Sequence, residues 1–281
     1  MHFDESLDLT PYAAPNTRIR FRLTDTDNDA ELFIDNVQIE TLAGGNDTED
    51  PLGHGTHVAG AIGGNGQLSH GNNRGIAPGA GILSLRVLDA EGQGSASDVI
   101  AALDWILLHG DAYAIKVVNL SLGKAVEVRA ADDPLVQAAE ALWDAGFVVV
   151  ASAGNYGRDG NFTITSPGNS PKLITVGSLT DEETDDLSDD YVSTYSSRGP
   201  TLLDHYAKPD LVAPGNKLVF PIPGNAKLKK DNPNRVVFDD YGEESYLELS
   251  GTSMAAAMTS GAAALMLDKD PNLTPDDVKA R

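Results

Sequence analysis

Residues 115–151 read IKVVNLSLGKAVEVRAADDPLVQAAEALWDAGFVVVA, and the prediction of the fold class starts from this stretch. Its two ends, residues 115–120 and 147–151, are short runs of Val, Ile, Leu and Phe, which are typical of buried β-strands. Between them, residues 133–145 carry apolar side chains at helical spacing, and Gly146 stands where such a helix would end. Two buried strands joined by a helix indicate a parallel pair with a crossover connection.

The same alternation continues on both sides of this stretch. Residues 82–88 (ILSLRVL) and 173–176 (LITV) are further apolar runs. A predicted helix follows the first run, with Ser97 or Asp98 as its N-cap. We therefore predict an α/β fold with a mostly parallel sheet and helices on both faces. Ligands bind such sheets at the carboxyl ends of the strands.

The first 40 residues follow a different pattern. Polar and apolar residues alternate over residues 18–23 (RIRFRL) and 31–39 (ELFIDNVQI), on either side of a turn rich in Asp. This alternation predicts an antiparallel β hairpin with one solvated face. The hairpin resembles the last two strands of a jelly-roll module of the carbohydrate-binding kind. We therefore expect residues 1–40 to be a remnant of such a module, separate from residues 41–281.

The composition disfavours several classes of protein. The chain has 281 residues, with 20 Lys and Arg against 42 Asp and Glu, and its net charge of −22 repels nucleic-acid phosphates and anionic lipids. It has no cysteine, so disulfide frameworks, thiolate metal sites and cysteine nucleophiles are excluded. No apolar run is long enough to span a membrane, and the N-terminus has no signal-peptide pattern. We expect a globular protein that binds neither nucleic acid nor membranes.

Three separated motifs carry residues suited to nucleophilic catalysis. His54 lies in GHGTHVAG, Asn155 lies in ASAGN after a predicted strand, and Ser253 lies in SGTSMAAA at the start of a predicted helix. Attack of a hydroxyl group on a carbonyl needs a base that takes the proton and donors that stabilise the oxyanion. A histidine, an amide at the end of a strand and a serine at a helix N-terminus supply these groups.

These motifs and their order resemble those of the subtilases, the family of subtilisin-like serine endopeptidases. Three further segments carry the resemblance, VNLSLG (118–123), YSSRGP (195–200) and KPDLVAPG (208–215). The likeness extends from about Gly44 to the C-terminus. It implies a subtilisin-like fold for residues 41–281 and an activity that hydrolyses peptide bonds through an acyl-enzyme.

The resemblance also implies roles for individual residues. His54 would be the general base and then the general acid, Ser253 would be the nucleophile, and Asn155 with the Ser253 backbone N–H would form the oxyanion hole. Two segments would wall the pocket for the substrate side chain, and residues 166–169 would close its base. The walls are Ser121, Leu122 and Gly123 on one side, and residues 151–154, including Ala153 and Gly154, on the other. Because these residues are small, we expect the pocket to accept sizeable side chains.

The aspartate of the family's triad has no clear counterpart. In the family it lies in an Asp-Thr/Ser-Gly motif, and this chain has no such motif. Asp25, in Asp-Thr-Asp, lies 29 residues before His54 and is the candidate counterpart within this chain, although the strand before it carries charges that a buried strand would lack. Asp35 lies only 19 residues before His54. The favoured interpretation places the true aspartate upstream of this chain, with residues 1–40 belonging to an inserted module.

A further alternative is an inactive or impaired relative that keeps a peptide-binding groove. Ala257 stands where the family usually has proline, and the chain stops in what resembles the start of a helix, so the family's closing elements are expected to be missing. We expect a propeptide in the full-length protein, a polypeptide substrate and an extracellular location.

The sequence names no metal ligands. His57 lies three residues after His54, but no third ligand accompanies the pair, so we interpret His57 as a structural histidine. The chemistry requires no cofactor. We interpret the acidic residues 181–190 as a solvated loop, with a calcium-binding loop as the alternative. A structural calcium ion is an expectation from the family resemblance.

Overall fold

The computed structural model describes residues 6–7, 17–20, 38–41, 50–182, 184 and 186–281. The chain divides into two compact units. The first unit comprises Met1–Gln93 and Phe220–Leu247, and the second comprises Gly94–Val219 and Glu248–Arg281. The chain therefore passes between the units three times.

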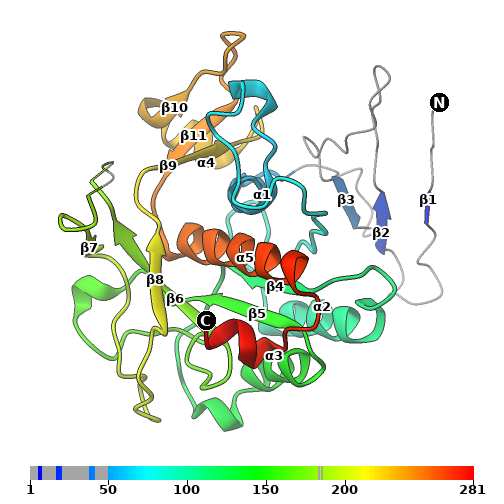
Figure 1. Ribbon diagram of the computed structural model, residues 1–281, viewed down its shortest axis with the longest axis vertical. Coiled ribbons are helices and arrows are strands. Elements are labelled where there is room, and N and C mark those ends of the chain that lie inside the picture. The colour runs from blue at the N-terminus through cyan, green and yellow to red at the C-terminus, as the bar shows by residue number, and fades with distance from the viewer. Residues whose placement is uncertain (1–5, 8–16, 21–37, 42–49, 183, 185) are drawn as a thin grey trace. The chain divides into compact units, whose positions relative to one another are not determined.

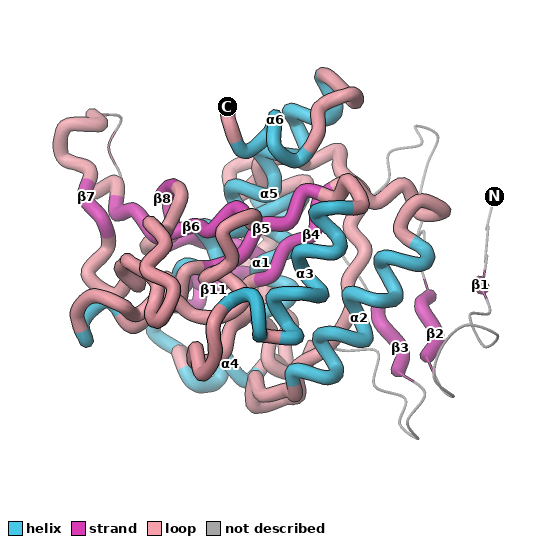
Figure 2. Tube along the Cα trace, turned by 90° about the horizontal axis from the view of Figure 1, so that it is seen from below, coloured by secondary structure: helices cyan, strands magenta, loops and turns pink. Residues whose placement is uncertain are grey.

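The second unit is built on a five-stranded, mostly parallel sheet (Figure 2). β4 (Val117–Leu120), β5 (Val148–Ser152) and β6 (Ile174–Thr180) pair in parallel, with Val118 opposite Val149 and Val150 opposite Ile174. β8 (Leu211–Pro214) also pairs in parallel with β6, whereas β7 (Tyr191–Val192) pairs antiparallel with the end of β6. The predicted sheet is confirmed.

Helices cover both faces of this sheet (Figure 1). α2 (Ala96–His109) and α3 (Pro134–Asp144) pack on each other on one face, and α5 (Thr252–Lys269) lies across β4, β5, β6 and β8 on the other. The short α6 (Pro275–Lys279) follows α5. The core lies between these layers, where every residue of β5 is buried and the first turns of α5 present Ala255–Ala257 with no exposed surface. The predicted α/β class is therefore confirmed.

The helix boundaries follow from capping chemistry. The Asp133 carboxylate accepts a hydrogen bond of 3.0 Å from the Leu135 N–H, and Pro134 occupies the first turn of α3, where its missing N–H costs nothing. Gly146 follows this helix with a φ of 98°. For α2, the N-cap is Ser95, whose hydroxyl accepts from the Asp98 N–H, and not Ser97 or Asp98 as predicted.

The first unit holds α1 (His54–Gly63) and the five-residue α4 (Lys227–Asp231). A small sheet has the strand order β10-β11-β9, and β9 and β11 continue across the unit boundaries. Three short strands near the N-terminus, β1, β2 and β3, pair antiparallel, with Thr17 opposite Thr41. The remaining bounds are β1 Ser6–Leu7, β2 Thr17–Arg20, β3 Gln38–Thr41, β9 Leu218–Pro221, β10 Val236–Val237 and β11 Tyr246–Leu249. Single 3-10 turns span Gln67–Ser69, Ala130–Asp132, Gly157–Asp159 and Pro233–Arg235.

Residues 82–88 differ from the sequence prediction. They form no strand, and no backbone-to-backbone hydrogen bond joins them to another described residue. Their side chains are half-buried. The apolar run therefore predicts partial burial correctly. A strand also needs a neighbouring strand to pair with, and the local composition does not show whether one is present. None of the helices in the described residues is long and apolar enough to cross a membrane.

Candidate active site

Ser253 lies in the first turn of α5, at the carboxyl end of β4. The Ser253 hydroxyl donates a hydrogen bond of 3.3 Å to the Ser121 carbonyl oxygen, and the Ser121 hydroxyl donates one of 2.7 Å to the Ser253 carbonyl oxygen. Within the described part of the chain, the Ser253 backbone N–H has no protein acceptor, as is usual in the first turn of a helix. A half-exposed hydroxyl thus stands beside a free donor and the positive end of the α5 dipole.

A series of side-chain hydrogen bonds holds the Ser121 hydroxyl in place. The Asn119 amide donates to the Ser121 hydroxyl at 2.9 Å, and the Ser260 hydroxyl donates to the Asn119 oxygen at 3.0 Å. Asn119 belongs to β4 and Ser260 to the third turn of α5, so this network joins the strand to the helix that carries Ser253. Sequence reasoning missed Asn119 and Ser260, because the two residues are 141 positions apart.

Asn155 follows β5 and is held in one orientation. Its carbonyl oxygen accepts from the Thr252 N–H at 2.9 Å and from the Thr252 hydroxyl at 3.1 Å. Because an N–H can only donate, the carbonyl oxygen must face Thr252, and the Asn155 NH₂ group is left as a donor. The Asn155 Nδ2 atom lies 3.6 Å from the point where a Cβ on Gly251 would stand, at the start of α5. The amide is therefore an oriented donor beside Ser253.

Thr252 was not among the predicted residues, although it stands next to Ser253 in the motif. Besides contacting Asn155, its hydroxyl accepts from the Gly154 N–H at 3.2 Å. Gly154 has a φ of 105°, in the region that favours glycine. Thr252 thus connects the start of α5 to the turn after β5.

The structure also brings the two predicted pocket walls together. Ser121, Leu122 and Gly123 follow β4, and Ala153 and Gly154 follow the neighbouring β5. The backbones of Lys124 and Ser166 exchange hydrogen bonds of 2.9 and 3.0 Å, so the segment after residue 164 runs beside the first wall. The Ala153 carbonyl oxygen accepts from the Thr165 N–H at 3.0 Å, so the same segment also contacts the second wall.

His54 is the first residue of α1, in the first unit, and Asp50 organises the start of this helix. One carboxylate oxygen of Asp50 accepts from the Gly53 N–H at 2.8 Å, and the other accepts from the N–H and hydroxyl of Thr56 at 2.8 and 3.0 Å. Gly53 has a φ of 92°, and a Cβ there would lie 2.4 Å from Ile222, so only glycine fits.

Burial and the nearby Asp50 carboxylate have opposite effects on the pKa of His54. Burial lowers the pKa of the His54 imidazole below its usual value, because removing water penalises the charged form, while the negative charge of Asp50 acts in the opposite direction. The neutral form, which is the form able to accept a proton, is therefore favoured near neutral pH.

His57 lies deeper in the same helix and has no exposed surface. Its Nε2 lies 2.9 Å from the Leu247 carbonyl oxygen, and its ring meets Phe220 edge-on at 5.5 Å between centroids. These contacts are those of a packed structural histidine. In the described residues, no group of three His, Asp or Glu side chains is arranged to hold a metal ion.

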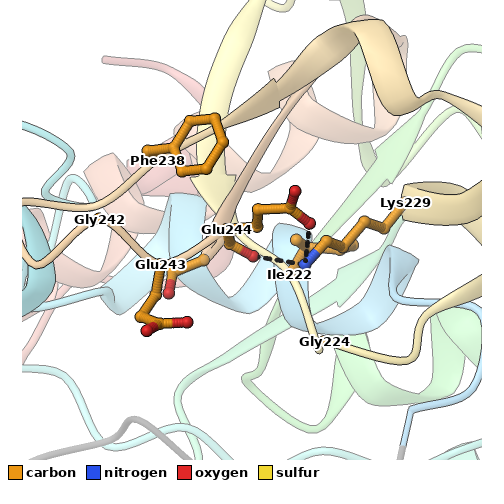
Figure 3. Close-up of a pocket in the computed structure, with 8 residues that line it drawn as sticks. Ile222, Gly224, Lys229, Phe238, Gly242, Glu243 and Glu244 are labelled. Carbon is orange, nitrogen blue, oxygen red and sulfur yellow. Dashed lines mark hydrogen bonds and ion pairs between the residues drawn. The ribbon is translucent and has the colours of Figure 1, made fainter.

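Asp25 and Asp35 lie outside the described residues, so the partner of His54 stays a prediction. The first unit also has an open pocket of about 480 Å³ (Figure 3), which no predicted site residue lines. Lys229 donates there to the Glu244 carbonyl oxygen at 2.7 Å and pairs with the Glu244 carboxylate at 3.1 Å. The remaining lining residues are Ile222, Gly224, Phe238, Gly242, Glu243 and Ser245.

Comparisons with known proteins show which family this chain resembles. A model of the subtilase family matches residues 9–281. Serine protease AprX of Bacillus subtilis (strain 168) is 40% identical over 235 residues, which are 82% of this chain and 52% of that protein. The extracellular serine proteinase of Thermus sp. (strain Rt41A) is 35% identical over 239 residues, 85% of this chain and 47% of that protein. The chain thus spans about half the length of these two relatives.

Solved structures show the same likeness. A cold-adapted subtilisin-like serine proteinase superposes with a TM-score of 0.61 at 30% identity, covering 84% of this chain and 68% of that one. Sphericase superposes with a TM-score of 0.66 at 26% identity, covering 86% of this chain and 70% of that one.

Proposed function

This chain belongs to the subtilase family, and we propose that it is a serine endopeptidase that cleaves peptide bonds through an acyl-enzyme. The observation that carries the proposal is the orientation of Asn155. Its carbonyl oxygen is committed to Thr252, so its NH₂ group is a fixed donor beside the N-terminal turn that carries Ser253. A donor that is oriented before the reaction stabilises developing negative charge without reorganisation.

In the first half of the proposed reaction, the Ser253 Oγ attacks the carbonyl carbon of the scissile peptide bond. The hydroxyl proton passes to the His54 imidazole, which the lowered pKa keeps neutral and ready to accept it. The tetrahedral oxyanion accepts from the Asn155 NH₂ and the Ser253 N–H. His54 then gives its proton to the leaving amine as the C–N bond breaks, and an ester of Ser253 remains.

In the second half, water attacks the ester carbonyl and gives a proton to His54. The oxyanion forms in the same hole, and the Ser253 Oγ takes the proton back as the C–O bond breaks and a carboxylic acid leaves. We propose that an aspartate orients His54, either Asp25 or a residue preceding this chain. We do not assign this role to Asp50, because both of its oxygens accept hydrogen bonds from the start of α1.

Labelling with a fluorophosphonate probe tests the proposal. The probe forms a bond only with an activated serine, so we expect the protein to be labelled and Ser253→Ala to remain unlabelled. Ser250→Ala is the matched control. The Ser250 hydroxyl accepts a hydrogen bond from the Lys217 N–H, so we expect this substitution to leave labelling intact. A folded wild-type protein that takes no label would contradict the proposed activity.

The alternative, an inactive relative with a peptide-binding groove, is favoured by the missing Asp-Thr/Ser-Gly motif. It predicts peptide binding that survives Ser253→Ala, together with no turnover by the wild-type protein. Calorimetric titration of a peptide beside a cleavage assay separates the two functions.

We further propose polypeptides as substrates, a propeptide in the full-length protein and an extracellular place of action, since one of the relatives is named an extracellular proteinase. The chemistry uses only side chains and water, so we propose no cofactor for it. A structural calcium ion is proposed from the family resemblance alone, with no ligands assigned to it. It predicts a melting temperature that calcium raises and EDTA lowers, and equal melting temperatures would contradict it.

A further inference from the structure

Four hydroxyl groups of the second unit form a continuous series beside β6. Thr180 and Ser178 belong to β6, and Ser193 and Tyr195 follow β7. The Thr180 and Ser193 oxygens lie 2.8 Å apart, and the Ser193 and Ser178 oxygens lie 3.0 Å apart. The Ser178 oxygen lies 2.8 Å from the Tyr195 hydroxyl. Tyr195 is half-buried and the other three side chains are at most 6% exposed, so these hydroxyls depend on one another for hydrogen bonds.

The direction of this hydroxyl series is fixed at its last member. The Tyr195 hydroxyl donates its single hydrogen to the Gly215 carbonyl oxygen at 2.8 Å, and a carbonyl oxygen can only accept. Tyr195 must therefore accept from Ser178, which commits the Ser178 hydrogen. By the same reasoning, Ser193 donates to Ser178, and Thr180 donates to Ser193. All four hydroxyls thus donate in the same direction, and each bond polarises the next.

The series ends at the start of α5. The Gly215 carbonyl oxygen accepts from the Gly251 N–H at 2.8 Å as well as from Tyr195. A Cβ added to Gly215 would lie 2.8 Å from the Gly251 carbonyl oxygen, so the two backbones are in close contact. Gly251 is the N-cap of α5, and the next residues are Thr252 and Ser253. One carbonyl oxygen therefore connects the Tyr195 hydroxyl to the turn that carries the proposed nucleophile.

We propose that the Tyr195 hydroxyl is a positioning group for the oxyanion hole. By holding the Gly215 carbonyl oxygen in place, it fixes the start of α5. This fixes the Ser253 N–H, and it also fixes Thr252, which orients Asn155. Tyr195 acts through backbone groups and takes no part in the reaction itself. The inference rests on the proposed peptidase activity.

The surroundings of Gly215 explain why one hydroxyl group has this effect. Glycine has no side chain that could hold its peptide unit, so the orientation of the buried Gly215 carbonyl depends on hydrogen bonds. Without the Tyr195 hydroxyl, that oxygen keeps the Gly251 N–H and loses its second donor. The two glycines are then free to shift together. A displacement of about 1 Å at a catalytic group can lower a rate by about 100-fold.

The test compares the wild-type protein with Tyr195→Phe, which removes only the hydroxyl oxygen. Fluorophosphonate titration counts the active molecules, so that kcat refers to those molecules alone. Loss of a whole oxyanion donor costs about 100- to 1,000-fold in kcat, and displacement costs less. We therefore expect kcat on a peptide p-nitroanilide to fall about 5- to 20-fold, while KM changes by less than about twofold.

A tetrahedral inhibitor adds a second measurement. The Ser253 Oγ adds to the carbonyl carbon of a peptide trifluoromethyl ketone, and the adduct places a negative oxygen in the oxyanion hole. Its Ki should rise in Tyr195→Phe by about the factor by which kcat falls. A merely structural role would lower the melting temperature and leave kcat and Ki per active molecule unchanged.

Two further variants sharpen the test. Ser178→Ala removes the donor that orients the Tyr195 hydroxyl, so it should lower kcat by about two- to threefold with KM unchanged. Tyr191→Phe is the matched control, because it removes the same atom from β7, where the hydroxyl bonds to the Glu182 side chain. It should leave kcat and Ki at the wild-type values.

An unchanged kcat and Ki in a Tyr195→Phe protein that takes the label would overturn the inference, as would a loss of kcat/KM that lies entirely in KM. If Tyr195→Phe does not fold, Ser178→Ala decides, and an unchanged kcat in that variant would overturn the inference. An equal loss of kcat in Tyr191→Phe would also count against it. A wild-type protein that takes no fluorophosphonate label would instead contradict the proposed activity itself.

Discussion

Thr252 and Asp50 each fix a neighbour that the proposed chemistry uses. Thr252 holds the Asn155 carbonyl with two hydrogen bonds, and Asp50 holds the first turn of α1, where His54 begins the helix. Neither residue was predicted from the sequence. The sequence motifs contain the residues that we propose to react. Thr252 and Asp50, which orient those residues, have common structural roles, one beside the serine and the other at the start of a helix. These roles can be recognised only from the hydrogen bonds in the folded structure, which join residues up to 97 positions apart in the sequence.

Asp50→Asn should move the acidic limb of the pH–rate profile to lower pH. The Asp50 charge raises the pKa of His54 against the lowering effect of burial, so its removal lets that pKa fall further. His54 then stays neutral, and able to accept a proton, to a lower pH. Asparagine keeps only one acceptor oxygen for the two backbone N–H groups that Asp50 binds, so the substitution should also cost about 1 kcal/mol of stability. The measurement is kcat/KM against pH between about pH 4 and 8, the range in which histidine titrates.

The control for this prediction is Asp240→Asn, which removes a carboxylate from the same unit that pairs with His70. Asp240 lies on a separate loop, so its replacement should leave the limb in place. An acidic limb that stays fixed in Asp50→Asn, or that moves equally in both variants, would show that Asp50 acts only as a helix cap.

Among the elements, α6 is attached to the sheet by the half-buried Lys279, which lies beside the buried Lys208. The Lys279 ammonium donates to the carbonyl oxygens of Pro171, Lys172 and Leu173 at 2.8–3.0 Å and pairs with Asp210 at 3.2 Å. Lys208, whose side chain is 2% exposed, donates to the same Leu173 oxygen at 2.8 Å and to Asp210 at 2.6 Å. Two ammonium groups thus share one carboxylate at the base of β6 and β8.

This cluster predicts that stability rises with pH above neutrality. Burial lowers the pKa of Lys208 from 10.5 to about 8, although Asp210 opposes the shift. Between these values the unfolded chain binds more protons than the folded one, so raising the pH favours folding. The gain is at most about 3 kcal/mol between pH 8 and 10.5, by the linkage relation. Urea unfolding of the wild-type protein and Lys208→Met at several pH values measures it.

Only the wild-type protein carries the titrating Lys208 side chain. Its free energy of unfolding, relative to that of Lys208→Met, should therefore increase between about pH 8 and pH 10.5. Lys116→Met is the control, since Lys116 is exposed and its loss should leave the pH dependence unchanged. A difference between wild type and Lys208→Met that stays flat or falls as the pH rises would contradict the lowered pKa.

The elements themselves were largely predictable. The apolar run 115–120 contains β4, run 147–151 overlaps β5, and the predicted helix 133–145 contains α3 with Asp133 as its cap. These succeed because a buried strand or an amphipathic helix leaves its period in the local sequence. Residues 82–88 failed as a strand because pairing depends on a distant neighbour.

Over the whole molecule, the two compact units divide the proposed machinery. Ser253, Asn155 and the pocket residues belong to the second unit, and His54 belongs to the first. The proposed oxyanion donors and pocket residues are thus all part of the second unit, and the proposed general base is part of the first. The chain as a whole is acidic, with a net charge of −22.

That charge predicts how the protein selects among substrates with the same residue at the scissile bond. A strongly negative protein attracts cationic peptides over long range and raises their encounter rate, and salt screens the attraction. A peptide with alanine before the scissile bond and arginines in its flanks should be cleaved with a kcat/KM that falls about tenfold between about 20 mM and 500 mM NaCl. A matched peptide with glutamines in place of the arginines should change little, because it has no charge to steer. Steady-state cleavage of both peptides across the salt series measures the effect, and an equal loss for both would mean that salt acts on the fold instead of on the encounter.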